Sequence, residues 1–198
     1  MNDQLTIDPL QTAVVVVDVQ RLFTDLFRTL VSPPLTEVLP NMTRFLAEAR
    51  NVGASIFLVR TVVAPEGHSR NTLQWPEYMR RHLSPGSAGT EWDPAIAPHE
   101  GDIEIVKQRY SSFFGTELDA MLRERKIQTV LIFGLTTDVC VQSTVRDAWQ
   151  LDYQTITLSD CCSDPRDDSH VSALARIVRN FGSVCSSSEI LANWHMRD

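Results

Sequence analysis

Short apolar runs recur along the whole chain, separated by longer amphipathic stretches. The clearest runs cover residues 12–17, 55–59, 103–106 and 129–133, followed by a fifth at 155–158 and a weaker sixth near Val184. Their shortness and their β-branched residues predict strands. The first and fourth runs, TAVVVV and TVLIF, are apolar almost throughout. That composition is typical of strands that are covered on both faces of a sheet.

Segments with apolar residues at helical spacing lie between these runs. One such pattern covers residues 35–49 and stops before Gly53, and others cover 118–122, 141–149 and 171–178. Alternation of strand and helix predicts a three-layer α/β/α fold of the Rossmann-like kind. In that fold a mainly parallel six-stranded sheet lies between helix layers, and right-handed crossovers connect its strands. The length of 198 residues fits one domain, residues 1–198.

One stretch interrupts this rhythm. Residues 64–101 contain five prolines and four glycines, together with Trp75, Tyr78 and Trp92. The stretch is too long for a plain connection in a compact domain, so it is either a lid or a binding loop with short helices. A packed surface excursion is the alternative. Because it follows the carboxyl end of a predicted strand, where ligands collect in open α/β sheets, we favour a part in a binding site.

Composition narrows the class of protein. Apolar residues make up 43% and charged residues 22%, and the net charge is −7, which argues against a nucleic-acid partner. No apolar run is long enough to cross a bilayer, and the first residues lack the pattern of a secretory signal. We therefore expect a cytoplasmic protein with no membrane partner. Its four cysteines form no CxxC pair and are expected to be free thiols.

Three chemically versatile residues lie at or near strand ends. Asp18 follows the first run, Lys107 follows the third, and Cys140 lies in the turn after the fourth. Because the carboxyl ends of parallel strands share one edge of the sheet, these side chains are expected to converge there. A polar residue that ends an apolar run is often only the first solvated residue of a loop. Spacing alone leaves both interpretations open.

Three sequence motifs favour the catalytic interpretation of these residues, because together they resemble those of a known family. They are VVVVDVQRLF around Asp18, IVKQRYSSFFGTEL around Lys107 and GLTTDVCVQSTVRDA around Cys140. Their order and intervals resemble those of the isochorismatase-like cysteine hydrolases, from about residue 12 to about residue 188. No single motif is specific, but the set of three is.

The resemblance implies a catalytic triad of Cys140 as nucleophile, Asp18 as base and Lys107 as the supporting cation. A free thiol has a pKa of about 8.5 and needs a base or a positive field to attack at neutral pH. We expect Lys107 and the start of the following helix to favour the thiolate of Cys140. Asp18 is expected to take the thiol proton and return it to the leaving nitrogen.

The resemblance also implies the surroundings of the reacting atoms. It places oxyanion donors at Thr136 and Cys140, with a cis peptide between Leu135 and Thr136. Pocket walls are expected from aromatic residues, although buried aromatic residues more often serve packing. The substrate-binding candidates are Phe23, Trp75, Arg109, Phe113 and Leu135. For Arg109, structural support of the site is favoured over binding of an acidic substrate.

A metal or other cofactor is not expected. Metal-dependent nicotinamidases of this superfamily carry a D-x-H motif after the second strand, whereas this chain has RTVVAPEGHSR there. The five histidines show no convincing spacing for a zinc site. The missing motif also argues against nicotinamide as the substrate.

The sequence therefore predicts a cysteine hydrolase that cleaves a C–N bond of a small amide, ureide or carbamoyl compound through an acyl-cysteine (thioester) intermediate. One alternative is isochorismatase, which hydrolyses a vinyl ether and needs no thiol. Another is a non-catalytic or redox-sensing protein on the same fold. The expected partners are a small-molecule substrate and further copies of the chain, in a dimer or tetramer.

Overall fold

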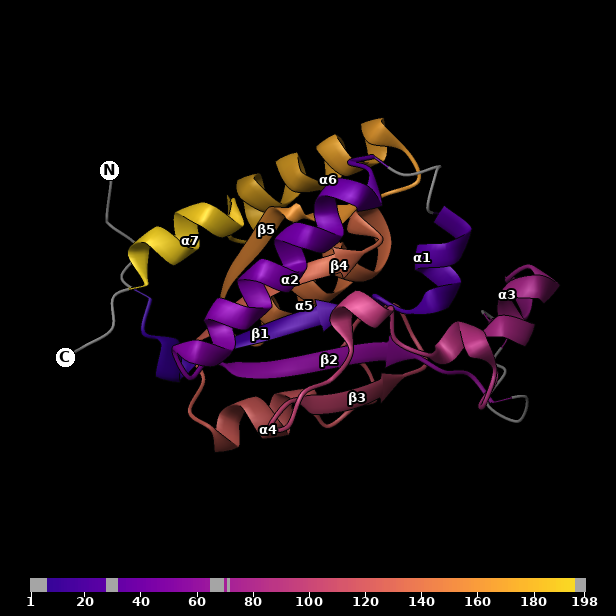
Figure 1. Ribbon diagram of the computed structural model, residues 1–198, viewed down its shortest axis with the longest axis horizontal. Helices are drawn as coiled ribbons and strands as arrows, with labels where there is room; N and C mark the ends of the chain where they lie inside the picture. Colours follow the sequence, from indigo (N-terminus) through magenta and orange to yellow (C-terminus); the bar gives the residue numbers. More distant parts are fainter. Residues whose placement is uncertain (1–6, 28–31, 65–69, 71, 195–198) are drawn as a thin grey trace.

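A single six-stranded sheet forms the centre of the molecule (Figure 1). The structure is a computed structural model and describes residues 7–27, 32–64, 70 and 72–194. All strand pairs in the sheet are parallel, in the order β3-β2-β1-β4-β5-β6. The strands are β1 (Thr12–Val17), β2 (Ser55–Thr61), β3 (Ile103–Lys107), β4 (Thr129–Leu135), β5 (Gln154–Ser163) and β6 (Ser183–Cys185). The predicted fold class is confirmed.

Helices cover both faces of this sheet. The helices α2 (Leu35–Asn51) and α7 (Ser187–Asn193) pack together on one face, and α5 (Gln142–Gln150) and α6 (Asp167–Asn180) pack together on the other (Figure 1). A further helix, α4 (Leu118–Glu124), connects β3 to β4. Among the described residues, none of the helices has the length and the apolar composition that crossing a membrane requires.

Apolar patterning explains why these layers form. Every residue of β1 is buried, because helices lie over both of its faces. Phe45 of α2 packs edge-on against Phe133 of β4, with 5.8 Å between ring centroids. It also stacks on Trp194 at 5.3 Å. Burial of such side chains, each contributing about 2–3 kcal/mol, holds the helix layer on the sheet.

The stretch of residues 64–101 leaves the sheet at the carboxyl ends of the strands, where α1 (Arg21–Phe27) also lies (Figure 1). It is tied to the sheet through the Gln20 side chain, which donates to the backbone oxygens of Thr61 (3.1 Å) and Gly89 (3.0 Å). The same amide group accepts from the Thr61 N–H at 2.8 Å. The stretch contains η3 (Thr72–Gln74), α3 (Glu77–His82), η4 (Ala88–Thr90) and η5 (Pro94–Ile96).

Gly134 marks a close approach between the two central strands. It pairs with Val17, and its φ of +136° is one that residues with a side chain rarely adopt. A Cβ atom at this position would lie 2.0 Å from the Val17 carbonyl oxygen. The sheet therefore needs glycine here, at the point where the chain turns from β4 toward Cys140.

We expect Gly134→Ala to lower the free energy of unfolding by at least about 3 kcal/mol, because the clash and the strained φ add. Gly115→Ala is the matched control, since Gly115 has a φ of +69° but a Cβ atom there would meet nothing within 4 Å. It should cost only about 1 kcal/mol. Urea denaturation of both variants measures the difference, and equal losses would contradict the argument from close approach.

Candidate active site

Three strand ends bring a lysine, an aspartate and a threonine together. The Lys107 Nζ donates to Asp18 Oδ2 at 2.6 Å and to Thr61 Oγ1 at 2.8 Å. The Thr61 hydroxyl donates in turn to Asp18 Oδ1 at 2.9 Å. All three side chains are buried. Because β2 lies between β1 and β3, Thr61 is placed to bridge the other two.

Asp18 has an unusual backbone conformation. Its φ is +54°, in the left-handed region that aspartate tolerates better than most residues. Its N–H donates to the Val59 carbonyl at 2.8 Å, which continues the β1–β2 pairing by one residue. The chain thus turns directly after the buried strand, and the carboxylate is held at the sheet edge by backbone geometry.

Cys140 follows β4 in a short helical turn. The turn, η6 (Thr137–Val141), is a π-helical segment that leads into α5. Such segments are frequent at functional sites. The peptide bond between Leu135 and Thr136 is cis, at the position where the family resemblance implied it. The Thr144 hydroxyl donates to the Cys140 carbonyl at 2.8 Å and ties the turn to the first residues of α5.

The ionisation of the Cys140 thiol differs from the expectation. Its pKa is raised, first because burial penalises the thiolate and further because Asp18 is negative and accepts a hydrogen bond from the thiol. The charge of Lys107 lowers this pKa but does not outweigh the burial. The expectation of a favoured thiolate was therefore wrong for the site as it stands. The thiol is the ground-state form, and a base is needed to activate it.

Lys107 keeps its positive charge in this buried place. Burial alone lowers the pKa of a lysine, but attraction to the Asp18 carboxylate and the hydrogen bond to it oppose this effect, and the pKa is raised. The ammonium group has three hydrogen-bond acceptors, since the backbone oxygen of Arg109 lies 3.0 Å from Nζ. All three donors of the ammonium group are therefore satisfied.

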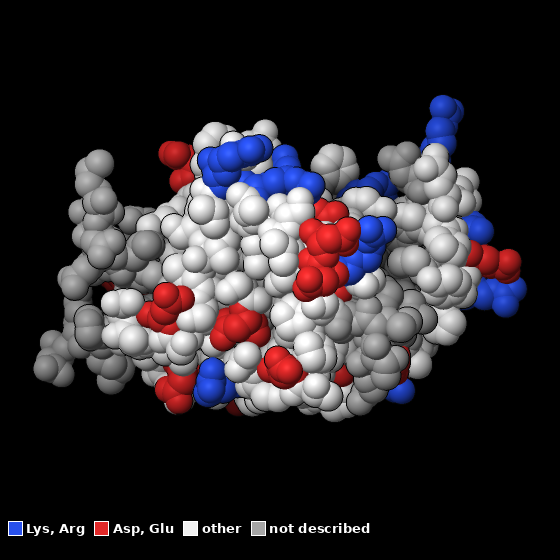
Figure 2. Space-filling model, turned by 90° about the horizontal axis from the view of Figure 1, so that it is seen from above, with Lys and Arg blue, Asp and Glu red and all other residues white. Residues whose placement is uncertain are grey.

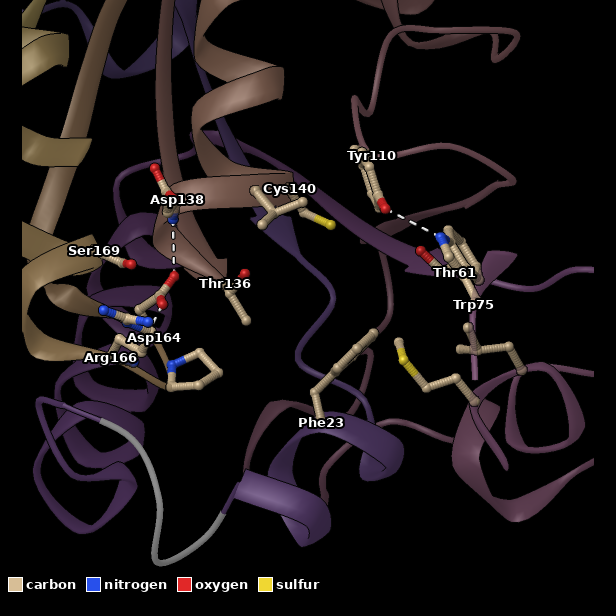
Figure 3. A pocket seen from close by; sticks show the side chains of 14 residues that line it. Phe23, Thr61, Trp75, Tyr110, Thr136, Asp138, Cys140, Asp164, Arg166 and Ser169 are labelled. Carbon is tan, nitrogen blue, oxygen red and sulfur yellow. Dashed lines mark hydrogen bonds between the residues drawn. The ribbon is translucent and has the colours of Figure 1, made fainter. Parts of the chain in front are cut away.

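The sulfur of Cys140 points into a cavity of about 350 Å³ (Figure 3). Trp75 and Tyr110 lie on one side of Cys140 in this view, and Asp138, Asp164 and Arg166 lie on the other. Phe23 closes a third side. The remaining lining residues are Thr61, Met79, Leu83, Thr136, Val139, Pro165 and Ser169.

Of the substrate-binding candidates, Phe23 and Trp75 line this cavity. The structure places the other three elsewhere. Leu135 is fully buried in a cluster behind Phe23, and Phe113 stacks on Tyr153 with 6.1 Å between ring centroids. The Arg109 guanidinium donates to the neighbouring Gln108 carbonyl at 2.7 Å. Packing positions Leu135 and Phe113, and a hydrogen bond to the neighbouring carbonyl positions Arg109.

Thr61 is the residue that the sequence analysis missed. The predicted strand stopped at residue 59, whereas β2 continues to Thr61. Its signal is weaker than that of Asp18 and Lys107, because Arg60 separates Thr61 from the apolar run 55–59, whereas Asp18 and Lys107 follow their runs directly. Among the described residues no group of three or more His, Cys, Asp or Glu side chains is placed to hold a metal ion.

We expect Thr61→Val to lower the free energy of unfolding by about 1–3 kcal/mol, because it removes one hydrogen-bond partner from each of two buried charges. Thr157→Val is the matched control. Thr157 is also fully buried on a strand, but its hydroxyl has no hydrogen-bond partner. That change should be neutral or stabilising. Chemical denaturation of both variants tests the difference, and equal effects would mean that Thr61 does not support the charged pair.

Comparisons with known proteins agree over most of the chain. Residues 12–189 match the isochorismatase domain family. The ureidoacrylate amidohydrolase RutB of Methylobacterium radiotolerans is 32% identical, over 92% of this chain and 79% of its own length. A cysteine hydrolase from Pseudomonas syringae pv. phaseolicola has a TM-score of 0.87 at 27% identity, covering 98% of both chains. The N-carbamoylsarcosine amidase from Thermoplasma acidophilum has a TM-score of 0.75 at 27% identity, covering 89% of this chain and 96% of its own.

Proposed function

The chain belongs to the isochorismatase family, and from this premise we propose that it is a cysteine hydrolase that cleaves a C–N bond of a small amide, ureide or carbamoyl compound. The observation that carries the proposal is the buried pair of Asp18 and Lys107, linked at 2.6 Å beside a cysteine that opens into a cavity. The likeness to a ureidoacrylate amidohydrolase and to an N-carbamoylsarcosine amidase supports the same class of reaction.

In the proposed mechanism Asp18 takes the proton of the Cys140 thiol while the sulfur attacks the substrate carbonyl carbon. A C–S bond forms, and negative charge collects on the carbonyl oxygen. We assign the stabilisation of this charge to the backbone amides of Thr136 and Cys140, because such donors contribute the largest share in related chemistry. Asp18 then gives its proton to the leaving nitrogen, the C–N bond breaks, and a thioester remains on Cys140.

Water completes the cycle. Asp18 takes a proton from a water molecule, whose oxygen attacks the thioester carbonyl. The C–S bond breaks, the carboxylic or carbamic acid product leaves, and the Cys140 sulfur regains a proton. Lys107 contributes its positive charge, which lies 2.6 Å from the Asp18 carboxylate and stabilises the thiolate as it forms. A lone carboxylate beside the sulfur would instead oppose that thiolate.

Two alternatives have less support. Hydrolysis of a vinyl ether, the isochorismatase reaction, needs no thiol, whereas Cys140 opens into the cavity beside the charged pair. Redox sensing needs a thiolate of low pKa and good exposure. Burial raises the pKa of Cys140, which disfavours that reaction.

A panel of amides, ureides and carbamoyl compounds, with ammonia release as the readout, tests the proposal. At least one compound should be hydrolysed, and dialysis against a strong chelator should leave its turnover unchanged. Isochorismate belongs in the same panel as the competing substrate. Turnover of isochorismate alone, or loss of activity with the chelator and recovery with zinc, would overturn the proposed reaction.

We also propose a homo-oligomer, on the basis of exposed apolar side chains on α5 and α6. Trp149, Val171 and Val178 are 51%, 58% and 60% exposed, respectively. The helices α5 and α6 contact each other, and exposed apolar patches commonly mark an interface. On the face seen from above in Figure 2, residues other than Lys, Arg, Asp and Glu cover much of the described surface, and the charged residues gather in separate groups. Sedimentation at micromolar concentration should give at least twice the 22.3 kDa mass of one chain, and the mass of a single chain would contradict the proposal.

A further inference from the structure

His170 is a buried side chain that has no part in the proposed mechanism. It lies near the start of α6, its exposed fraction is 7%, and it is not among the described residues that line the cavity. Its Nδ1 atom lies 2.9 Å from the hydroxyl oxygen of Thr137, which is fully buried. Either neutral form of the ring satisfies this contact, because the hydroxyl can donate to Nδ1 or accept from it.

The imidazole ring of His170 carries no charge at neutral pH. Burial lowers the pKa of His170, although the carboxylates of Asp164 and Asp167 oppose this effect. Removing the ring therefore removes a hydrogen bond but no charge. A neutral replacement reports on that hydrogen bond alone.

Thr137 lies where the chain turns toward the reacting sulfur. It is the first residue of η6, directly after the cis peptide bond between Leu135 and Thr136, and three residues before Cys140. Thr136, the residue before the turn, makes no side-chain capping hydrogen bond. The start of the turn therefore depends on side chains from elsewhere in the chain.

Three contacts from α6 and the loop before it reach this start. Asp164 accepts from the N–H of Asp138 at 2.9 Å (Figure 3). Arg176 donates to the Asp138 carboxylate at 3.1 Å, but both side chains of this pair are partly exposed, so water and salt weaken it. The contact between His170 and Thr137 is buried, where water cannot replace either partner. Unlike Asp164, His170 acts on the turn from outside the cavity.

We infer that His170 is a positioning residue of the proposed hydrolysis: through Thr137 it holds the turn that presents the Cys140 sulfur and the amides of Thr136 and Cys140 to the substrate carbonyl. The inference rests on the proposed function, which assigns those amides to the developing negative charge. Backbone donors stabilise that charge only from the right place, and a displacement of about 1 Å can lower a rate about a hundredfold. Without the hydrogen bond the rate should fall more than the affinity for substrate, because the wall at Trp75 comes from another segment.

Reversible addition of acetaldehyde to Cys140 tests the inference before any substrate is known. The thiol sulfur bonds to the aldehyde carbon and the thiol proton moves to the carbonyl oxygen, which takes the place of the substrate oxygen. Carbon-13 NMR of labelled acetaldehyde gives the dissociation constant, and Cys140→Ala identifies the signal of this adduct. His170→Leu fills similar space without a hydrogen bond and should raise the dissociation constant at least about tenfold. His170→Asn, whose amide can hydrogen-bond to the Thr137 hydroxyl, should recover most of that loss.

Two further variants separate positioning from stability. Thr137→Val removes the same hydrogen bond from its other end, so it should weaken the adduct as His170→Leu does, and the double variant should be no weaker than either alone. Leu46→Ala, a buried change on α2, should lower the free energy of unfolding but leave the dissociation constant unchanged. Wild-type affinity in His170→Leu, additive losses in the double variant, or no adduct in the wild-type protein overturns the inference.

Ammonia release from the panel of amides judges the proposed reaction separately. For any compound that is hydrolysed, His170→Leu should lower kcat at least about tenfold and leave KM within about twofold. An adduct on Cys140 without hydrolysis of any compound contradicts the proposed reaction and leaves the positioning role standing. Hydrolysis with an unchanged kcat in His170→Leu contradicts the positioning role alone.

Discussion

Replacing Cys140 with alanine is expected to lower kcat/KM for amide hydrolysis by at least about 10⁴-fold, because no acyl-enzyme can form without the sulfur. The fold should survive, since the exposed fraction of Cys140 is 8% and the change removes a single atom beside a cavity. A stability loss of about 1 kcal/mol is the expected size. Ammonia release and urea denaturation measure the two effects.

Cys185→Ala serves as the control for this change. Cys185 is a free, half-buried cysteine at the end of β6, away from the cavity, and its loss should leave turnover unchanged. In the wild-type protein, mass spectrometry of an acid-quenched reaction should find the acyl group on Cys140 alone. Substantial turnover by Cys140→Ala, or an acyl group on another residue, would contradict covalent catalysis by this thiol.

The second large effect is expected from the buried pair. Lys107→Met should lower the free energy of unfolding by about 3–5 kcal/mol, because it leaves the Asp18 carboxylate buried without its partner. Asp18→Asn should be similarly costly, because an unpaired ammonium group then remains. Both side chains are fully buried, so water cannot compensate. Each variant should also lose turnover almost completely, because the base or its supporting charge is gone.

Combining the two changes separates folding from catalysis. The double variant Asp18→Asn with Lys107→Met leaves no unpaired charge in this buried place, unlike either single variant. Most of the lost stability should therefore return while turnover stays absent. The pair of Arg50 and Asp102, linked at 2.7 Å at the opposite end of the strands, is the matched control. Arg50→Met should lower stability but keep activity. If the double variant recovered turnover, the pair would have only a structural role.

The sequence predicted the sheet because its central strands are apolar on both faces. It was less accurate where polar residues continue a strand. The predicted fifth strand stopped at residue 158, whereas β5 runs to Ser163, past Ser159 and Asp160. The Asp160 carboxylate is satisfied by the N–H and hydroxyl of Ser187, at 2.7 Å each. A partner so distant in the sequence gives no local signal.

Short helices were the other difference. The helices α1 (Arg21–Phe27) and α7 (Ser187–Asn193) were not predicted, although α4, which is equally long, was. The start of α7 did carry a local signal, because Ser186 and Glu189 form a capping box. That pattern, S-x-x-E, is visible in the sequence as SSSE.

For the candidate site, the sequence indicated which residues end the strands but not how deeply they are buried. Asp18 and Lys107 meet because parallel strands end at one edge, which topology alone predicts. The pKa of Cys140 was expected to be lowered by nearby positive charge, whereas burial raises it. Charged residues can be read from a sequence, but the burial of the thiol cannot. Phe113 was placed in the cavity wall on its aromatic character, whereas Tyr153, forty residues away in the chain, supplies the surface that it stacks on.

The contacts of Gln20 have a consequence for the engineering of this protein. Gln20 holds Thr61 and Gly89 at fixed places, and the neighbouring Arg21 and Val19 pair with the backbone of Glu91 and Asp93. The segment between these attachment points thus enters and leaves the sheet edge at the same positions whatever lies between them. We therefore expect changes of sequence between Thr61 and Gly89 to leave the ends of β1, β2 and β3 in place. Because Trp75, Met79 and Leu83 of this segment line the cavity, the residues between Thr61 and Gly89 are the place to change which substrates the protein binds.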